Sequence, residues 1–542
     1  LRFPTQLEEL SLMSNSLKGV IKDSHFTNMS KLETLELSDN SLVLKFSPNW
    51  APSFQLGYIG LRSCKVGPLF PKWIQSQNKI RFLDISNNGI SDTLPIWFWD
   101  KFELRYHISI NISCNNLRGM IPDLSPENHF LHLNFGSNQF EDSFLFLCSG
   151  GVVGTLYQLD LSNNKLSGEI LDCCTQFKSL VYLNMSQNNF SGKIPTSQGS
   201  LLELQVLLLR NNNLTGELSS SLRNCIKLVM LDMTENRLSE SIPDWIGSKL
   251  LELQFLSLGN NSFNGSLPLQ ICYLKSIQLL DLSLNNISGQ IPKCIKNFSS
   301  MTQVPSLRDY QVHLYMAYIN SFSIYLTYNL NAFLMWKGSE QMFKNNGLSL
   351  LKSIDLSSNQ LSREIPKEIA NLFGLISLNL SRIYLTEKIP SNIGKLTSLE
   401  FLDLSRNQLV GSIPLSLAQI DRLTILDLSH NYLSGKIPTG TQLQSFDSSK
   451  YEGNVDLCGP PLKKLCIDRV SRQQPIANFH ENDNLIFNRE FYTSMAIGFV
   501  MSFWGVFGSI LIIRSWRHAY FKFLSNLEDI LYIMVAMKVF KW

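Results

Sequence analysis

Residues 180–195 read LVYLNMSQNNFSGKIP, and residues 204–219 read LQVLLLRNNNLTGELS. Both follow the pattern LxxLxLxxNxLxGxIP, with other apolar residues at some of its Leu and Ile positions and Ser219 in place of the Pro. The pattern recurs along most of the chain about every 24 residues. The Asn that closes LxLxxN marks each repeat, at Asn15, Asn40, Asn88, Asn115, Asn138, Asn164, Asn188, Asn212, Asn236, Asn261, Asn285, Asn359, Asn407 and Asn431. Cys64 and Ile383 occupy the same slot, which gives sixteen repeats. Self-similarity of this length is typical of a solenoid, because each coil buries its apolar face only against its neighbours.

The alternation inside each repeat predicts one short strand per coil. In Leu159-Asp160-Leu161 the two leucines point into the coil and Asp160 points outward. Stacked coils then form one long parallel sheet with an exposed concave face. The predicted fold class is an α/β leucine-rich-repeat solenoid, with that curved sheet, a non-repeat island and a single C-terminal transmembrane helix. Such a fold offers a broad platform rather than a pocket.

The marker Asn is interpreted as structural. It lies where the chain turns away from the strand, and its amide carries both donors and an acceptor for the buried backbone groups of neighbouring coils. Ile383 offers neither a donor nor an acceptor. We therefore expect the coil around Ile383 to lack part of this ladder.

The repeats and the stretches between them divide the chain into segments. We expect leucine-rich repeats at 1–295 (about twelve coils), an island insertion at 296–349, four repeats at 350–440, a C-terminal cap at 441–467, a juxtamembrane segment at 468–492, a transmembrane helix at 493–513 and a short cytoplasmic tail at 514–542. Leu1 falls inside a repeat, with neither a signal peptide nor a polar cap before it. The N-terminal cap and signal peptide are therefore expected to be missing from this chain.

Charge and cysteines indicate the compartment. A formal net charge of +3 over 542 residues is too small to suggest a nucleic-acid partner. Several of the ten cysteines are spaced as neighbouring coils require: Cys148 with Cys173 or Cys174, Cys272 with Cys294, and Cys458 with Cys466. Disulfides at these positions predict an oxidising compartment. The alternative is that these cysteines are buried thiols.

Ten N-x-S/T sequons agree with secretion, at Asn28, Asn111, Asn184, Asn189, Asn213, Asn260, Asn264, Asn286, Asn297 and Asn379. A template that reads LxLSxNxLSG also creates sequons by chance. Asn111, Asn184 and Asn379 lie between strand leucines, so a glycan on any of them would stand on the concave face.

Residues 493–513 read TSMAIGFVMSFWGVFGSILII, which is uncharged and long enough to cross a bilayer as a helix. Basic residues follow it, at Arg514, Arg517 and Lys522, so the positive-inside rule places the repeats outside the cell. The predicted localisation is the cell membrane, as a single-pass type I protein with extracellular repeats. Small residues at close-packing spacing predict a helix-pairing face, at Ser494, Gly498, Ser502, Gly505 and Ser509. The alternative is an ordinary anchor in which small residues are scattered.

The island is rich in aromatic residues: Tyr310, Tyr315, Tyr318, Phe322, Tyr325, Tyr328, Phe333 and Trp336. Tyr and Trp make good binding anchors because they join apolar area to a polar group. A long insertion inside a compact body is usually functional. The alternative is that these rings pack the island against the coils.

These features resemble the plant receptor-like proteins of the leucine-rich-repeat class, in particular the group of fungal-elicitor and xylanase receptors. The resemblance rests on the coils, on the island followed by four repeats, and on three specific stretches: WKGSEQMFKNN at 336–346, YEGNVDLCGPPL at 451–462 and GFVMSFWGVFGSILIIRSWRHAYFKFL at 498–524. The family's island motif Tyr-x8-Lys-Gly matches Tyr328, Lys337 and Gly338, which the resemblance implicates, beside Trp336, in contacts with a ligand or co-receptor. The acidic segment that the family carries before the helix is thin here.

The resemblance implies a kinase-lacking cell-surface receptor that binds an extracellular microbial protein or peptide and signals in plant defence. Its implied partners are an adaptor leucine-rich-repeat receptor kinase and a co-receptor kinase. The alternatives are a developmental peptide receptor, a membrane-bound decoy or inhibitor of a microbial cell-wall enzyme, and a truncated, non-signalling family member. We expect no enzyme, cofactor or metal site, because no catalytic or metal-ligand constellation stands at useful spacing; His107 and His132 fall at coil positions.

Overall fold

The computed structural model describes residues 4–102, 106–121, 129–141, 148, 155–173, 175, 177–303, 314–319, 322–327, 331–336, 339–344, 348 and 350–466. The chain forms two compact units, Leu1–Ile467 and Asp468–Trp542. The second unit, with the predicted transmembrane helix and its pairing residues, lies outside the described residues. Within the described ranges, none of the helices is long and apolar enough to cross a bilayer.

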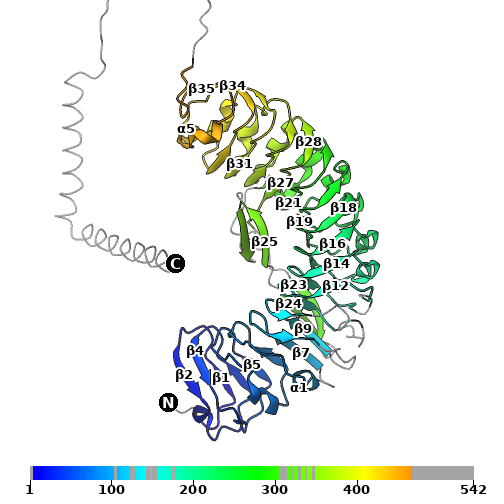
Figure 1. Ribbon diagram of the computed structural model, residues 1–542, viewed down its shortest axis with the longest axis vertical. Coiled ribbons are helices and arrows are strands. Elements are labelled where there is room, and N and C mark those ends of the chain that lie inside the picture. The colour runs from blue at the N-terminus through cyan, green and yellow to red at the C-terminus, as the bar shows by residue number, and fades with distance from the viewer. Residues whose placement is uncertain are drawn as a thin grey trace, which may run out of the picture. The chain divides into compact units, whose positions relative to one another are not determined.

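The first unit is a curved solenoid whose concave face is lined by one parallel sheet (Figure 1). Its sixteen strands follow the chain in order: β1 Glu9–Ser11, β3 Thr34–Glu36, β5 Tyr58–Gly60, β6 Phe82–Asp84, β7 Tyr106–Asn111, β9 His129–Asn134, β11 Gln158–Asp160, β13 Tyr182–Asn184, β15 Val206–Leu208, β17 Met230–Asp232, β19 Phe255–Ser257, β21 Leu279–Asp281, β27 Ser353–Asp355, β29 Ser377–Asn379, β31 Phe401–Asp403 and β33 Ile425–Asp427. Each predicted repeat contributes one strand to this sheet. Leu159 pairs with Leu183, and Leu183 with Leu207, so the repeat assignment is confirmed.

The convex side carries short strands and single-turn helices. The strands are β2 Lys18–Lys22, β4 Ser41–Lys45, β8 Arg118–Gly119, β10 Gln139–Phe140, β12 Ser167–Glu169, β14 Asn189–Gly192, β16 Asn213–Gly216, β18 Arg237–Ser241, β20 Ser262–Asn264, β22 Ser288–Gly289, β28 Gln360–Arg363, β30 Tyr384–Leu385, β32 Val410–Gly411, β34 Tyr432–Lys436 and β35 Asp456–Cys458. The helices are η1 Asp23–Phe26, η2 Lys72–Ser76, α1 Trp97–Asp100, η5 Thr196–Ser200, η6 Ser220–Asn224, α2 Trp245–Lys249, η7 Leu269–Tyr273, η8 Lys293–Asn297, α3 Ser299–Thr302, η9 Lys367–Asn371, η10 Ile393–Lys395, η11 Leu415–Gln419 and α5 Thr441–Ser445. A last single-turn helix, η12 Ser448–Tyr451, lies instead beside the concave strand β33, because Leu428 N donates to Lys450 O at 2.9 Å. The Pro of the IP motif stands directly before several of these helices, as Pro195 does before η5. Pro suits this position because it has no N–H to satisfy and cannot continue the preceding strand.

The marker asparagines form a hydrogen-bonded ladder. Asn188 Nδ2 donates to the carbonyl oxygens of Leu161 and Ser186 at 3.0 and 3.1 Å, and its Oδ1 accepts from Leu166 N at 3.1 Å. Each such amide therefore ties its own turn to the preceding coil. The ladder continues one step past the last predicted repeat, because Asn454 Nδ2 donates to Leu428 O at 2.9 Å.

The two substituted ladder positions behave differently. Cys64 Sγ donates to Leu37 O at 3.2 Å, where the other coils use an amide N–H. Ile383 is buried in the core and offers no acceptor to Leu361 N, the position that donates to the ladder amide in other coils. Cys64 thus supplies the hydrogen-bond donor of the marker Asn, and Ile383 supplies neither its donor nor its acceptor.

The sheet is continuous across the island. β21 pairs directly with β27, with Leu280 opposite Ile354, and Asn359 Oδ1 accepts from Ile287 N at 3.0 Å. The preceding coil runs through Met301, which is fully buried, and so extends beyond residue 296, where we expected the island to begin. The island itself contains two antiparallel hairpins, β23 Leu314–Ile319 with β24 Phe322–Thr327, and β25 Asn331–Trp336 with β26 Ser339–Lys344.

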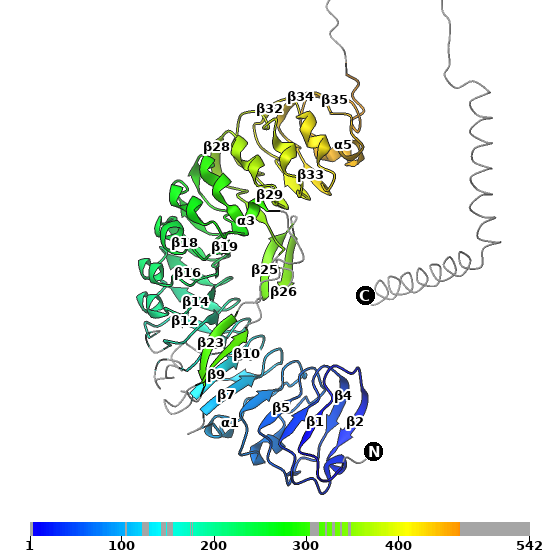
Figure 2. The same cartoon turned by 180° about the vertical axis from the view of Figure 1, so that it is seen from behind.

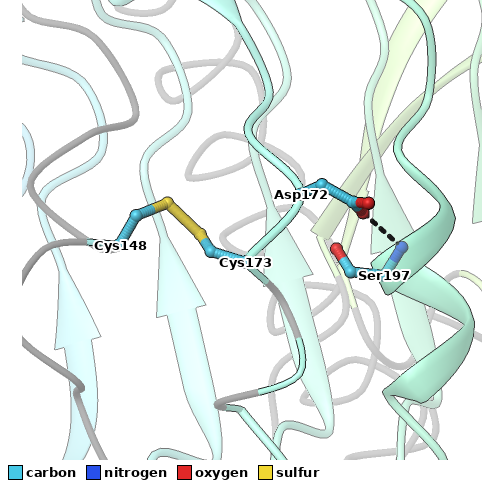
Figure 3. The surroundings of a disulfide bond; sticks show 4 residues. All are labelled: Cys148, Asp172, Cys173 and Ser197. Atoms are coloured by element: carbon cyan, nitrogen blue, oxygen red, sulfur yellow. Dashed lines mark hydrogen bonds between the residues drawn. A yellow bond between two sulfur atoms is a disulfide. The ribbon is translucent and has the colours of Figure 1, made fainter.

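The three predicted disulfides are present, and the first joins Cys148 to Cys173 (Figure 3). The others join Cys272 to Cys294, in adjacent coils, and Cys458 to Cys466, in the terminal cap. Beside the first bridge, Asp172 accepts a hydrogen bond from Ser197 N of the next coil, as Figure 3 shows. In the cap, the buried Tyr451 donates its hydroxyl to Leu443 O at 2.6 Å, which closes the last apolar coil.

Candidate binding surface on the concave face

The middle of the concave sheet carries an apolar patch. Its side chains lie outside the inward leucine positions, on the strands β9 to β21 or, for Tyr157 and Val181, directly before β11 and β13. They are nevertheless buried: Leu131, Tyr157, Val181, Tyr182, Val206, Leu208, Met230, Phe255 and Leu279. An outward position is buried only when something covers the sheet. In the described residues, the cover comes from the island.

The hairpin β25–β26 lies on the concave side of the solenoid in both views (Figures 1 and 2). Trp336 and Phe343, one from each strand, pack against the apolar patch. Their rings meet edge to face, with centroids 5.8 Å apart. The hairpin therefore contributes its own aromatic contact to the covered surface.

An ion pair ties the same hairpin to the sheet. The buried Arg210, two residues beyond β15, donates to Glu340 of β26 and, at 2.6 Å, to Glu235 Oε1 of a neighbouring coil. Arg suits such a site because its guanidinium keeps its charge when buried and presents several donors. The contact between Arg210 and Glu340 joins residues 130 positions apart in the sequence.

Only part of the predicted island site falls in the described residues. Trp336 is half-buried against the apolar patch, so it packs the island on the coils, as the alternative interpretation proposed. Tyr328, Lys337 and Gly338 lie outside the described residues. Their role in ligand or co-receptor contact stays a prediction.

A hollow of ≈ 350 Å³ lies on the concave face next to the hairpin. Tyr182, Asn184, Arg210 and Asp232 line it from the sheet, and Met342 lines it from β26. Burial raises the pKa of Asp232 to about 6, although Arg210 opposes the shift. Further along the sheet, burial and the neighbouring Asp281 raise the pKa of Asp355 to about 7.

The N-terminal coils present a different concave surface. Tyr58 and Phe82 stack on adjacent strands, with centroids 4.2 Å apart, and both side chains remain partly exposed. Arg62 pairs with Asp39 on the same side. Here the sheet offers aromatic and charged groups that the described part of the island does not cover.

The predicted sequons differ in exposure. Asn28, Asn189, Asn260, Asn264, Asn286 and Asn297 are exposed, and Asn111, Asn213 and Asn379 are half-buried. Asn184 is buried: its Nδ2 donates to Asp160 Oδ2 and its Oδ1 accepts from Ser186 Oγ. Because a glycan would be attached at that Nδ2, the expected glycan at Asn184 does not fit this arrangement.

Sequence analysis missed exposed apolar side chains on the coils after the island. Tyr384 and Tyr432 directly follow ladder positions and are largely exposed, as is Val455 beyond Asn454. In the coils before the island the same position holds polar residues, such as Asn189 and Asn213. After the island the position alternates, with Gln360 and Gln408 in the other two coils, so a comparison of equivalent positions along the repeats could have found the two tyrosines.

The described residues hold no cluster of three or more His, Cys, Asp or Glu that could bind a metal. Burial lowers the pKa of His132 to about 4, so its imidazole is neutral. Its Nδ1 lies 3.0 Å from Ser109 Oγ on the next strand. His132 is thus part of the sheet surface.

Comparison with known families matches the repeats. One leucine rich repeat model matches residues 5–66. A second matches residues 79–100, 155–177, 179–201, 203–225, 227–249, 252–274, 276–298, 350–372, 398–420 and 422–442.

Two tomato (Solanum lycopersicum) proteins are similar over nearly the whole chain. Receptor-like protein EIX2 is 48% identical over 95% of this chain, and Receptor-like protein EIX1 is 47% identical over 94%. The chain covers 52% of each of them, so it spans about half the length of these relatives. The chain belongs to the leucine-rich-repeat family, and over nearly its whole length it is similar to these two plant receptor-like proteins.

Solved structures share the fold. The ectodomain of the Arabidopsis thaliana receptor kinase GASSHO1/SCHENGEN3, in complex with CASPARIAN STRIP INTEGRITY FACTOR 2, superposes with a TM-score of 0.63 at 28% identity and covers 85% of this chain and 54% of its own. A TDR receptor superposes with a TM-score of 0.62 at 23% identity, covering 80% of this chain and 70% of its own. The second likeness supports the fold alone.

Proposed function

We propose that the chain is part of a kinase-lacking cell-surface receptor that binds an extracellular microbial protein or peptide. The observation that carries this proposal is the docking of the island hairpin on the concave sheet through Trp336, Phe343 and the Arg210–Glu340 pair. The hairpin docked on the apolar patch gives a ligand a fixed edge to bind against. The partly exposed rings of Tyr58 and Phe82, on the N-terminal coils of the same sheet, give it aromatic contacts.

Signalling is proposed to run through partner receptor kinases, an adaptor kinase and a co-receptor kinase. The exposed Tyr384, Tyr432 and Val455 on the last coils support a protein contact near that end of the solenoid. The sequence of 493–513 supports a type I membrane anchor with the repeats outside the cell.

A second candidate is a receptor for a peptide made by the plant itself. The structural relative GASSHO1/SCHENGEN3 was solved in complex with CASPARIAN STRIP INTEGRITY FACTOR 2, and its identity to this chain is 28%. The higher identity to the EIX proteins, near one half over almost the whole chain, favours the first candidate.

The test is a response assay in leaf tissue that expresses the chain. Secreted fungal proteins are applied to tissue with the chain and to tissue with an empty vector, and the oxidative burst is recorded. The proposal expects a burst that depends on the chain. A chain that reaches the surface and answers plant peptide fractions, but not fungal ones, would favour the second candidate.

A further inference from the structure

Three large apolar side chains stand exposed in a row along one flank of the solenoid. Leu202, Ile226 and Leu251 are 55%, 56% and 49% exposed. We call these three residues the flank stripe. They lie after the convex-side helices η5, η6 and α2 and before the concave strands, so they face neither the core nor the ligand surface.

The three residues hold equivalent positions in successive coils. Each stands two residues before an inward leucine whose N–H closes a turn: Leu204 N donates to Leu201 O at 3.1 Å, Leu228 N to Cys225 O at 3.0 Å, and Leu253 N to Leu250 O at 3.1 Å. The core of these coils is filled by those inward residues, which are fully buried. Packing therefore does not require apolar residues in the stripe. Single exposed apolar residues are common, but a contiguous row marks an interaction site.

The charges around the stripe are mainly positive. Lys178 and Lys275 hold the same position in the coils before and after it. A groove of ≈ 610 Å³ runs beside it, lined by Leu202, Ile226, Arg223, Asn224 and Lys249. Among the acidic groups nearby, Glu203 is paired with Lys227 at 2.7 Å, and the exposed Glu252 follows Leu251, so the cations outnumber the carboxylates. The surface thus presents apolar area framed by cations.

The sequons of these coils leave this flank open. Asn189 and Asn213 begin the convex strands β14 and β16, and Asn264 ends β20, all beyond the ladder position and on the opposite side of the coil from the stripe. None of the chain's sequons falls between a convex-side helix and its following strand from Lys178 to Lys275. Glycans on these sequons would not shield the stripe.

We propose that the flank stripe is a docking surface for a second protein that presents an apolar ridge between carboxylates. Charge selects this occupant, because the cations at both ends and along the groove need opposite charges when they are desolvated. A second copy of this chain fits poorly. In a two-fold pair, Lys178 would face Lys275 of the other copy and the cations of both grooves would meet. The site is separate from the concave ligand surface and does not rest on the proposed function.

The test uses the full chain in nanodiscs and two synthetic helical peptides as probes. Both carry leucines at every third or fourth position; one is flanked by Glu and the other by Lys. Fluorescence anisotropy should show at least tenfold tighter binding of the Glu-flanked peptide. The triple variant L202S/I226S/L251S should lose that binding at least tenfold. Phe373→Ser, at the equivalent exposed position of a coil beyond the island, should leave it unchanged.

Two further measurements guard against misfolding and self-association. Ile226→Thr completes an N-x-T sequon at Asn224, and a glycan there should block the Glu-flanked peptide in secreted protein of unchanged melting temperature. Sedimentation across a range of concentrations detects dimers. Equal binding of both peptides, full binding by the triple variant, or a wild-type dimer that Ile226→Thr dissolves would each overturn the proposal.

Discussion

Arg210 on the concave sheet and Glu340 on the island form an ion pair that spans 130 residues of sequence. Arg210 is buried and also pairs with Glu235, whereas the Glu340 side chain is 42% exposed. The pair is the charged part of a contact whose apolar part is Trp336 and Phe343 on the central patch. The island is thereby placed over the middle coils of the sheet.

Glu340→Gln should loosen the hairpin without unfolding the solenoid. The expected loss is about 1 kcal/mol, because one partner is solvent-exposed. Hydrogen exchange should become faster in 331–344 and stay unchanged in the strands β29 to β33. Gln341→Glu, on the same strand, is the matched control. Unchanged exchange in Glu340→Gln would show that the aromatic contacts hold the hairpin alone.

Ile383→Asn should complete the ladder. The new amide can accept from Leu361 N and donate to the turn carbonyls, with a net gain of about 1 kcal/mol for each bond formed. The substitution also removes the buried Ile383 side chain, which lowers the global free energy of unfolding. Local hydrogen exchange therefore reports the new ladder bonds better than global stability does. Exchange near 359–390 should slow. Equal or faster exchange there would mean that the coil has adapted around Ile383.

Asp232→Asn should alter the pH dependence of stability. The pKa of Asp232 is raised in the folded state to about 6, against about 3.9 when unfolded. The folded state therefore binds the proton more tightly, and this group costs stability as pH rises from about 4 through 6. At pH 8 the variant should be more stable than the wild type by about 3 kcal/mol, and near pH 4 the gain should become small. Urea unfolding at both pH values measures the difference, and an equal difference at both would contradict the assignment.

Cys64 and Cys114 should differ in reactivity. Cys64 is buried, donates to Leu37 O, and burial raises its pKa to about 11, whereas Cys114 is exposed. The thiolate is the reactive form, so iodoacetamide at pH 8 should label Cys114 and spare Cys64 in the folded chain. Mass spectrometry after timed labelling reports both sites. Comparable labelling of the two cysteines would contradict a buried Cys64 thiol that takes part in the ladder.

Gly498→Leu should weaken association with an adaptor receptor kinase if the small residues from Ser494 to Ser509 form a pairing face. Insertion should be unaffected, because Leu is as apolar as the lipid. Co-precipitation from membranes, at equal surface level, measures the effect. Ala496→Leu serves as a control off that spacing. Undiminished co-precipitation would assign pairing to the extracellular coils.

The coils were predictable from sequence because their contacts are local and periodic. Leu159, Leu183 and Leu207 repeat a spacing that only neighbouring coils can satisfy. Asn454 was missed because the cap keeps the ladder amide but loses the leucine spacing before it. The register of Cys148 with Cys173 also needed the structure, since Cys174 stands beside it in the sequence.

The island was predictable as an insertion but not as a docked hairpin. Nothing local to Trp336 or Glu340 indicates a contact with residues more than a hundred positions earlier. The burial of Asn184 was hidden for a similar reason, because it depends on Asp160 of the neighbouring strand. Contacts between equivalent coils follow from periodicity, whereas contacts between the island and the sheet depend on surface shape and charge.

The central claim is that the island and the concave sheet together recognise a ligand. Its most direct test is the oxidative burst to secreted fungal proteins in tissue that expresses Tyr328→Ala, Lys337→Ala or the convex-side control Lys395→Ala at equal surface level. Lys395 is exposed in η10, away from the concave face. We predict that Tyr328→Ala and Lys337→Ala lose most of the oxidative burst and that Lys395→Ala keeps it. An equal response from all three variants would contradict the account.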